Sequence, residues 1–318
     1  MKNRNLPTVA VLAAASLLAS CSAPPPQNAA PAKPRVALVL KTLNSPFFIE
    51  MQTGAKAAAD RLGLDLVVQA AEREVDVEKQ MQIVENLIQT GIKALLITPS
   101  GSREIVPVLA KAQAAGIPII VVDTRLDPAT AAAASVKAAV FIGSDNYEGG
   151  RAAGTELVLA TEGKANAAIL EGIPGHETSD SRLRGFKDVI KDSPGVKLLA
   201  SQTANWERDQ GFTVFQNMLQ AHPSIDAVFA CNDMMALGAI EAIAAAGKTG
   251  KIRVIGFDAV DDARKAIEMG TMLASVAQFP GEMGRMAAES AAKLIKGETV
   301  EADQRVRIEL IKKAEAAK

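Results

Sequence analysis

The chain has 318 residues, of which 48% are hydrophobic and 22% charged, a balance that excludes a wholly disordered chain and supplies core material for two domains. The 35 Lys and Arg residues nearly balance the 36 Asp and Glu residues, so the charge gives no footprint for nucleic acid. Two cysteines and two widely separated histidines favour neither a disulfide framework nor a metal site.

The first 20 residues have the pattern of an export signal. Lys2 and Arg4 precede the apolar run VAVLAAASLL, which is too short to remain as a membrane anchor. The run leads into Leu-Ala-Ser and then Cys21, as in a lipoprotein box, so we expect residues 1–20 to be a signal peptide and Cys21 to carry a lipid. An ordinary signal peptide with an incidental cysteine is the alternative. Residues 21–34 are rich in Pro and Ala and predict an extended tether.

From Arg35 onward, short β-branched runs alternate with Ala-rich segments of helical spacing. The runs predict eleven strands, at residues 36–41, 64–69, 93–98, 117–123, 139–145, 164–172, 196–202, 226–233, 251–258, 271–278 and 305–310. Nearly continuous apolar runs fit strands buried on both faces, and their alternation with helices predicts parallel α/β sheets. Eleven strands are too many for one open sheet in a chain of this length. We therefore expect two similar lobes of five or six strands, with a break near residues 141–150.

Polar and aromatic residues gather just after the predicted strands. In open parallel sheets this is the edge where ligands bind. The candidate ligand-binding residues are Asn44, Ser45, Phe47, Phe48, Thr98, Asp123, Arg125, Arg182, Trp206, Asn232, Asp258 and Gln278. Asp and Arg bind pairs of hydroxyls through charge-assisted hydrogen bonds, Asn and Gln supply a donor and an acceptor together, and aromatic rings cover apolar C–H faces. The combination suits a sugar or a polyol.

Each of these residues also has a structural interpretation. Asn44, Asn232 and Asp258 could cap helices, the two phenylalanines could belong to the core, and Arg182 could be a solvated charge. Capping does not explain Arg125, Trp206 and Gln278, so the joint pattern favours a binding site.

Other chemistries fit the sequence poorly. It has no GxGxxG after a strand, no P-loop lysine motif and no GxSxG nucleophile elbow. Carboxylates at the strand ends could form an acid–base pair, but no nucleophile accompanies them. We therefore predict no catalytic residue, no cofactor and no metal.

Seven segments of the sequence resemble those of a known protein family. They are KTLNSPFF (41–48), IPIIVVDTR (117–125), GSDNYEGG (143–150), LASQTANWERDQG (199–211), AHPSIDAVFACNDMMALGA (221–239), VIGFDA (254–259) and VAQFP (276–280). From about Arg35 to its end, the chain resembles the periplasmic sugar-binding proteins of ABC importers, in the ribose-binding branch of the type I fold. Repressors that share this core carry an N-terminal DNA-binding motif, where this chain has the signal and the tether.

The resemblance implies two Rossmann-like lobes joined by three crossovers, with the ligand between them. By analogy the N-lobe is 35–143 plus 279–305, and the C-lobe is 144–278 plus 306–318. Phe47 matches a ring-stacking phenylalanine, Phe48 its apolar neighbour and Trp206 an aromatic on the opposite face of the sugar. The matched hydroxyl-binding positions are Asp123, Arg182, Asn232, Asp258 and Gln278.

The chain departs from the ribose-binding pattern at four places. Ser45 and Thr98 each stand where that pattern has asparagine. The Asp-Arg pair of the pattern is replaced by Asp123-Thr124-Arg125, which would displace Arg125 from the sugar, and Trp206 replaces a phenylalanine. A monosaccharide other than ribose, or a polyol, is therefore as compatible with these residues as ribose.

The resemblance also implies partners and a location. We expect an exported, monomeric, lipid-anchored receptor that closes around a monosaccharide or polyol and delivers it to a membrane permease, with no nucleic acid and no enzymatic turnover. One alternative is a sensor that presents its closed form to a chemoreceptor or kinase. A lesser alternative is an exported sugar-processing enzyme.

Overall fold

The computed structural model of the chain describes residues 1–2 and 32–313. The predicted cleavage region, Cys21 and most of the predicted tether lie outside the described residues. From Lys33 onward the chain forms one compact unit. Among the described residues, no helix is both long and apolar enough to cross a membrane.

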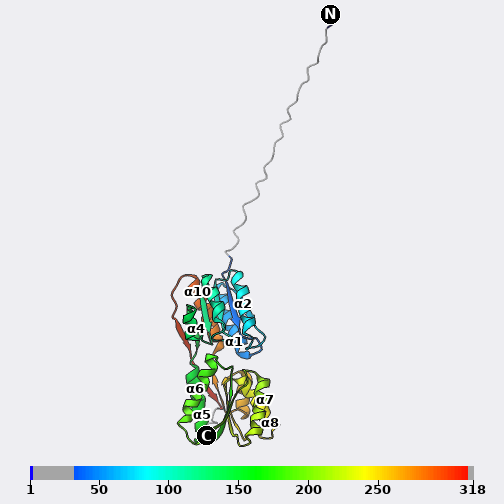
Figure 1. Cartoon of the computed structure of the whole chain (residues 1–318), viewed down its shortest axis with the longest axis vertical. Helices are drawn as coiled ribbons and strands as arrows, with labels where there is room; N and C mark the ends of the chain where they lie inside the picture. Colours follow the sequence, from blue (N-terminus) through cyan, green and yellow to red (C-terminus); the bar gives the residue numbers. More distant parts are fainter. Residues whose placement is uncertain (3–31, 314–318) are drawn as a thin grey trace. The chain divides into compact units, whose positions relative to one another are not determined.

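The first lobe is built on a six-stranded parallel sheet with the order β11-β5-β4-β3-β1-β2 (Figure 1). Its strands are β1 (Arg35–Leu40), β2 (Asp65–Ala70), β3 (Ala94–Ile97), β4 (Ile119–Val122), β5 (Val140–Ser144) and β11 (Asp303–Val306). Its helices are α1 (Pro46–Leu62), α2 (Val77–Gln89), α3 (Val106–Ala114), α4 (Pro128–Ala133) and α10 (Pro280–Ile295).

The second lobe repeats this plan with the strand order β12-β10-β9-β8-β6-β7. Its strands are β6 (Ala165–Glu171), β7 (Val196–Thr203), β8 (Ala227–Ala230), β9 (Arg253–Asp258), β10 (Ala274–Ala277) and β12 (Glu309–Lys312). Its helices are α5 (Asn146–Ala160), α6 (Glu177–Lys191), α7 (Arg208–Ala221), α8 (Asp233–Ala245) and α9 (Asp261–Met269). All its strand pairs are parallel except that between β10 and β12.

Burial on both faces explains why the strands read as continuous apolar runs. In β1, Val36, Leu38 and Leu40 pack into the core under α1 and α10, whereas Ala37 and Val39 pack into the core under α2 and α3. Every residue from Val36 to Leu40 is therefore fully buried, although successive side chains point to opposite faces. In the second lobe, helices α5 and α6 lie on one side of the sheet and α7 and α8 on the other (Figure 1). The predicted α/β class with two lobes is confirmed.

The end of the chain differs from the sequence-based expectation. The run at 305–310, predicted as one strand, is split between two strands in different sheets: β11 pairs with β5, and β12 pairs with β10. The chain also passes between the sheets from β5 to α5 and from β10 to α10. Three connections therefore join the lobes.

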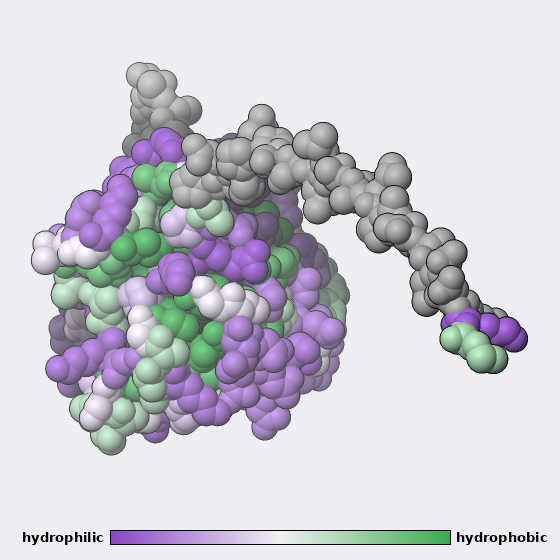
Figure 2. Space-filling view, turned by 90° about the horizontal axis from the view of Figure 1, so that it is seen from above, coloured by the Kyte–Doolittle hydropathy of each residue, from purple (hydrophilic) through white to green (hydrophobic). Residues whose placement is uncertain are grey.

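On the face shown in Figure 2, hydrophilic residues surround smaller apolar areas. The large exposed apolar side chains from Lys33 onward are Leu43, Ile49, Val75, Leu159, Leu198 and Met269. They are distributed over both lobes, so they do not form one large apolar face.

Candidate functional site

A polar cavity lies between the two lobes, at the carboxyl ends of their strands. Twelve residues line it: Lys41, Ser45, Phe47, Phe48, Glu74, Asp123, Thr178, Arg182, Trp206, Asn232, Asp258 and Gln278. The cavity, counted out to where it opens to solvent, has a volume of about 310 Å³. The lining is mostly charged and polar, unlike the mainly apolar lining of a typical drug-sized site. It suits a small ligand with many polar groups.

Backbone strain concentrates at this cavity. Asp123, Trp206 and Asp258 have φ angles of 65°, 69° and 112°. Residues other than glycine rarely adopt positive φ angles of this kind. Each such residue costs of order 1–3 kcal/mol and persists where the surrounding structure imposes it, most often at functional sites. Asp123 and Asp258 stand at the ends of β4 and β9, where the strained backbone turns their carboxylates into the cavity.

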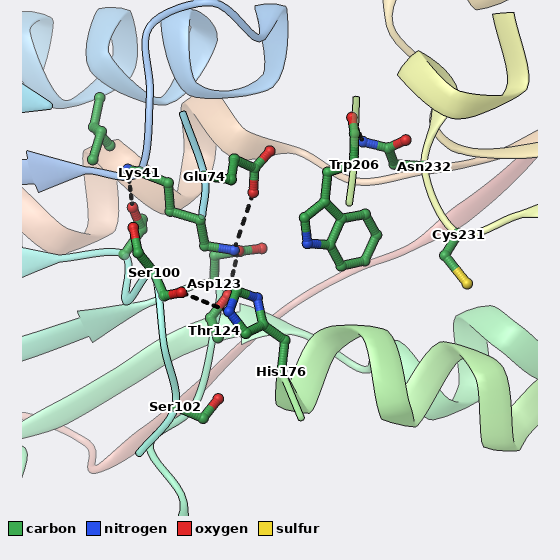
Figure 3. A network of polar contacts seen from close by, with 12 residues as sticks. Lys41, Glu74, Ser100, Ser102, Asp123, Thr124, His176, Trp206, Cys231 and Asn232 are labelled. Carbon is green, nitrogen blue, oxygen red and sulfur yellow. Dashed lines mark hydrogen bonds and ion pairs between the residues drawn. The ribbon is translucent and has the colours of Figure 1, made fainter. Parts of the chain in front are cut away.

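The first lobe contributes a buried ion-pair cluster centred on Lys41. Its Nζ lies 3.5 Å from Glu74 Oε2 and 3.6 Å from Asp123 Oδ2 (Figure 3). Burial raises the pKa of Glu74 to about 7, although Lys41 acts against the shift. Asp123 Oδ2 also accepts a hydrogen bond of 2.9 Å from Thr124 Oγ1. The cluster thus presents an ammonium donor between two carboxylate acceptors.

The second lobe contributes an arginine held from several sides. Arg182 is only 4% exposed; its Nε donates to Asn146 Oδ1 at 2.9 Å, and its Nη1 donates to Cys231 O at 2.7 Å. The guanidinium carbon lies 3.7 Å from the centre of the Phe257 ring, a cation–π contact. Asp258 Oδ1 lies 3.7 Å from Arg182 Nη1. These partners fix the guanidinium group at the cavity wall.

Asp258 joins this arginine to Gln278 at the next strand end. Gln278 Nε2 donates to Asp258 Oδ1 at 2.8 Å. Burial raises the pKa of Asp258 to about 6, against the effects of Arg182 and of the hydrogen bond from Gln278. Both of these contacts use Oδ1, so the other carboxylate oxygen of Asp258 can accept charge-assisted hydrogen bonds from the hydroxyl groups of a ligand.

Aromatic rings line the cavity from both lobes. Phe47 and Phe48 open α1, with their rings 5.2 Å apart and nearly perpendicular. Trp206, in the loop before α7, is 6% exposed and lies beside the glycine at the end of β6, Gly172. Rings on both sides of a narrow polar cavity provide surfaces for the C–H faces of a sugar.

Several polar atoms around the cavity are buried without a hydrogen-bond partner among the described residues. Among the lining residues they are Trp206 Nε1, Gln278 Oε1 and Thr178 Oγ1. The indole N–H only donates, the amide oxygen only accepts, and the hydroxyl does both. Since buried polar groups are normally hydrogen-bonded, these atoms indicate a ligand that both donates and accepts. Polyhydroxylated molecules have this property.

The structure brings nine of the twelve candidate residues to the cavity wall. They are Ser45, Phe47, Phe48, Asp123, Arg182, Trp206, Asn232, Asp258 and Gln278. Asn232 also caps α8, with its Oδ1 accepting from Met235 N and its Nδ2 donating to Trp206 O. The capping and binding interpretations are therefore compatible for this residue.

Three candidates are not on the wall. Asn44 is directed to the first lobe's own backbone, where its Nδ2 donates to Glu72 O at 2.8 Å. Thr98 is fully buried, and its Oγ1 accepts from Lys41 N at 3.1 Å. Arg125 binds Asp303 at 2.8 Å and stacks on the Phe141 ring. Each of the three has a partner within the first lobe, and Thr98 supports the cavity wall through Lys41.

Lys41, Glu74 and Thr178 line the cavity but were missed from the sequence. Lys41 is the last residue of the first predicted strand and was assigned to it. A lysine that closes an otherwise apolar buried run was an available signal, because a buried ammonium needs a partner. Glu74 comes four residues after the end of β2, and Thr178 opens α6, which also carries Arg182.

The described residues hold no group of three or more His, Cys, Asp or Glu side chains placed to bind a metal ion. The one described cysteine, Cys231, is fully buried. Burial raises the pKa of its thiol to about 12, so it is held as the unreactive thiol.

Comparison with known proteins identifies the class. Residues 36–299 match the model of a family described as "Periplasmic binding protein domain". Together with the two α/β lobes, this match shows that the chain belongs to the periplasmic binding protein family, with the type I fold.

Comparison with individual proteins shows which members of the family the chain is similar to. The chain is 38% identical to the D-ribose/D-allose-binding protein of Pseudomonas aeruginosa, over 91% of this chain and 92% of that protein. It is also 38% identical to the ribose import binding protein of Escherichia coli, over 89% and 92%. A solute-binding protein of Actinobacillus succinogenes, solved with bound D-allose, matches with a TM-score of 0.84 and 38% identity, covering 88% of this chain and 98% of that one. These names describe binding and import, and none describes an enzyme.

Proposed function

We propose that this chain is the substrate-binding lipoprotein of an ABC sugar importer. It captures one monosaccharide between its lobes and delivers it to a membrane permease. The observation that carries the proposal is the cavity itself, where unpartnered donors and acceptors, two charged clusters and rings from both lobes meet. The names of the relatives support the same class.

The residues that contact the sugar come from both lobes. Asp123, Lys41 and Glu74 hold hydroxyls from the first lobe, and Arg182, Asp258 and Gln278 hold hydroxyls from the second. The rings of Phe47 and Trp206 cover the C–H faces of the sugar. Since neither lobe alone surrounds the cavity, binding favours the closed arrangement over an open one by the contacts that the second lobe adds.

The ion-pair cluster favours a hexose over a pentose. Lys41 and Glu74 add a donor and an acceptor to the wall beside Asp123, and a hexose has one more hydroxyl group to satisfy them. The relative solved with D-allose supports this choice. We therefore propose an aldohexose such as D-allose as the ligand, ahead of D-ribose.

Fluorescence of the single tryptophan tests the proposal. A fragment from Ala32 onward is titrated with pentoses, hexoses and polyols while the emission of Trp206 is followed. We expect a saturable change with D-allose at a lower concentration than with D-ribose. A folded fragment that shows neither a fluorescence change nor a rise in melting temperature with any sugar contradicts a sugar-binding function.

Asp258→Ala tests the second wall of the same cavity. Removing the carboxylate leaves Arg182 without its carboxylate partner and sugar hydroxyls without an acceptor, at a cost of about 2–3 kcal/mol. This corresponds to a sugar affinity about 30- to 150-fold weaker. Asp262→Ala, on the exposed surface of α9, is the control and should bind normally. An unchanged sugar affinity in Asp258→Ala would show that Asp258 does not bind the sugar.

Import and anchoring need separate tests in cells. Deleting the gene for this chain should abolish uptake of the labelled sugar that the chain binds. Loss of chemotaxis with intact uptake would favour the sensor alternative. Cys21→Ser should move the protein from the membrane fraction to the soluble fraction if Cys21 carries the lipid. A protein that stays in the membrane fraction after this change is not anchored through that residue.

A further inference from the structure

A buried histidine joins the lobes beside the cavity without lining it. His176, directly before α6 in the second lobe, is 3% exposed. Its Nε2 lies 2.6 Å from the carbonyl oxygen of Ser100, in the loop that follows β3 in the first lobe (Figure 3). The next residue repeats the connection, since Glu177 N donates to Ser102 Oγ at 3.2 Å. Two successive residues of one lobe thus bind two nearby residues of the other.

The first lobe presents this carbonyl on a rigid support. Gln80 of α2 is fully buried, and its Oε1 accepts from Ser100 N at 2.8 Å. Its Nε2 donates to Thr98 O at 2.9 Å and lies 3.3 Å from Leu40 O. One side chain therefore fixes the Ser100 loop to the ends of β1 and β3. The carbonyl can receive His176 without reorganisation of the loop.

The second lobe couples the same contact to the sugar site. His176 precedes the first turn of α6, and Arg182 lies in the second turn of the same helix. Asp180 N donates to His176 O at 2.9 Å, within that first turn. When His176 docks on Ser100, α6 is therefore brought to the first lobe with its arginine at the cavity.

The surroundings of the ring disfavour a second proton. In this contact the neutral ring donates from Nε2 to the Ser100 carbonyl, which leaves Nδ1 as an acceptor. Nδ1 is buried without a partner among the described residues. A protonated ring would place a new N–H there without an acceptor, and would bring a second positive charge toward Lys41.

One charged group dominates the electrostatic effect on the pKa of the ring. Lys41, from the end of β1, is the ionised group that acts most on the imidazole. Asp123, from the end of β4, and Glu74, from the loop after β2, are both paired with that lysine. On the ring's own helix, Glu177 Oε1 accepts from Ser181 Oγ, and Asp180 Oδ1 faces Gly175 N. The groups that contact the ring from the Ser100 loop are uncharged.

We propose that the contact between His176 and Ser100 is a closing contact between the lobes that requires the neutral imidazole, so that acid weakens sugar capture through this residue. The proposal rests on the proposed function, since it assumes closure around a sugar. Burial is the main reason, and Lys41 the second, that the pKa of His176 falls to about 3 in the closed arrangement. An exposed histidine has a pKa near 6.5.

The sign of the pH effect follows from this difference. Because closure lowers the pKa of His176, closing the lobes releases a proton whenever the open form is protonated. The full contribution of His176 to the closing free energy is therefore present above about pH 7. This contribution is lost as the pH falls below about 6.5. Between pH 7.5 and 5.5 this residue should weaken binding about tenfold. Glu74 and Asp258 act in the opposite sense, because burial raises their pKa values.

A matched variant separates His176 from these carboxylates. His176→Gln keeps an N–H donor for the Ser100 carbonyl but does not titrate, and the carboxylates stay the same in both proteins. The dissociation constant for D-allose is measured at pH 7.5 and 5.5, and each protein is referred to its own value at pH 7.5. We expect the wild-type affinity to fall about tenfold relative to that of His176→Gln. Parallel pH profiles would overturn the proposal.

The second histidine provides a control on the same chain. His222 stands at the C-terminal end of α7, opposite the end that follows Trp206. His222→Gln should therefore keep the pH profile of the wild type. If His222→Gln removes the pH dependence and His176→Gln does not, the effect belongs to another part of the molecule and the proposal is wrong.

A ring titration by NMR tests the contact in the unmodified chain. The chain has two histidines, so two ring signals are assigned with the two Gln variants. With D-allose bound, His176 should stay neutral to below pH 5, and an ordinary pKa there would refute the closing contact. If D-allose binds at no pH, the proposed ligand has failed, and the titration is made with the sugar of the fluorescence panel that does bind: a pKa below 5 in that complex supports the closing contact, and an ordinary pKa overturns it.

Discussion

Among the single side chains of the cavity, Glu74 has one of the charges most disfavoured by burial. Its pKa rises from 4.5 to about 7 because the folded protein buries it. The folded form therefore holds a proton that the unfolded chain has released. The stability from this group is complete below about pH 4.5 and is lost as the pH rises through about 7.

Glu74→Gln should remove this part of the pH dependence. Between pH 5 and 8 we expect the variant to lose about 1–3 kcal/mol less free energy of unfolding than the wild type. Denaturation in urea at the two pH values, without sugar, measures the difference. Glu78→Gln, at an exposed position opening α2, is the control and should behave as the wild type. Equal losses in the wild type and Glu74→Gln contradict the assignment.

The same cluster shows what can be predicted of single residues. Reading the strand ends finds Asp123, because a carboxylate directly after a buried strand is conspicuous in the sequence. Arg125, two positions further on, was a candidate for the same site, but it pairs with Asp303 of β11 and is not the cationic partner of Asp123. The partner is Lys41, from the end of β1. Which strand end supplies a charge depends on the strand order and on the turn after each strand, and no local pattern encodes either.

At the level of secondary-structure elements, the end of β6 positions the tryptophan of the cavity. The residue after this strand is Gly172, and a Cβ there would collide with Cζ2, Cη2 and Cε2 of Trp206. The indole therefore lies flat against the backbone of the strand end. This close approach requires glycine at that position.

Gly172→Ala should displace the indole and cost about 1–3 kcal/mol of stability. It should also weaken sugar binding, since Trp206 lines the cavity. The clash involves the six-membered ring of the indole, so the same change should cost less in a Trp206→Phe background. A double-mutant cycle of unfolding free energies measures this coupling. Equal costs of Gly172→Ala in the two backgrounds would show that the indole does not rest on the strand.

The elements were predictable because burial on both faces leaves a strong signal in the sequence. Continuous apolar runs such as VALVL of β1 are typical of strands that helices cover on both sides. The run at 305–310 was wrongly predicted as one strand, because the chain crosses from one sheet to the other within it. Val306 ends β11 and Glu309 opens β12, with only Arg307 and Ile308 between them. A break of two residues in an extended chain does not change its apolar and polar pattern, so the sequence alone cannot place it.

At the scale of the whole molecule, the lobes are held together by the three connections and by contacts at the mouth of the cavity. One contact is an ion pair: Arg73 Nε, in the loop after β2, lies 3.7 Å from Glu207 Oε1, the residue before α7. Their side chains are 51% and 30% exposed. A pair this exposed contributes at most about 1 kcal/mol and is screened by salt.

Reversing this pair should change closure without touching the sugar. Arg73→Glu places two carboxylates together across the mouth and should weaken D-allose binding by up to about fivefold at low salt, with little effect at high salt. The exchange Arg73→Glu with Glu207→Arg should restore most of the loss, because the attraction is rebuilt with its charges interchanged. Arg103→Glu, whose partner Asp127 lies on the same lobe, should leave the affinity unchanged. If the exchanged pair binds no better than Arg73→Glu alone, the loss came from another role of Arg73, and the lobes close without help from this contact.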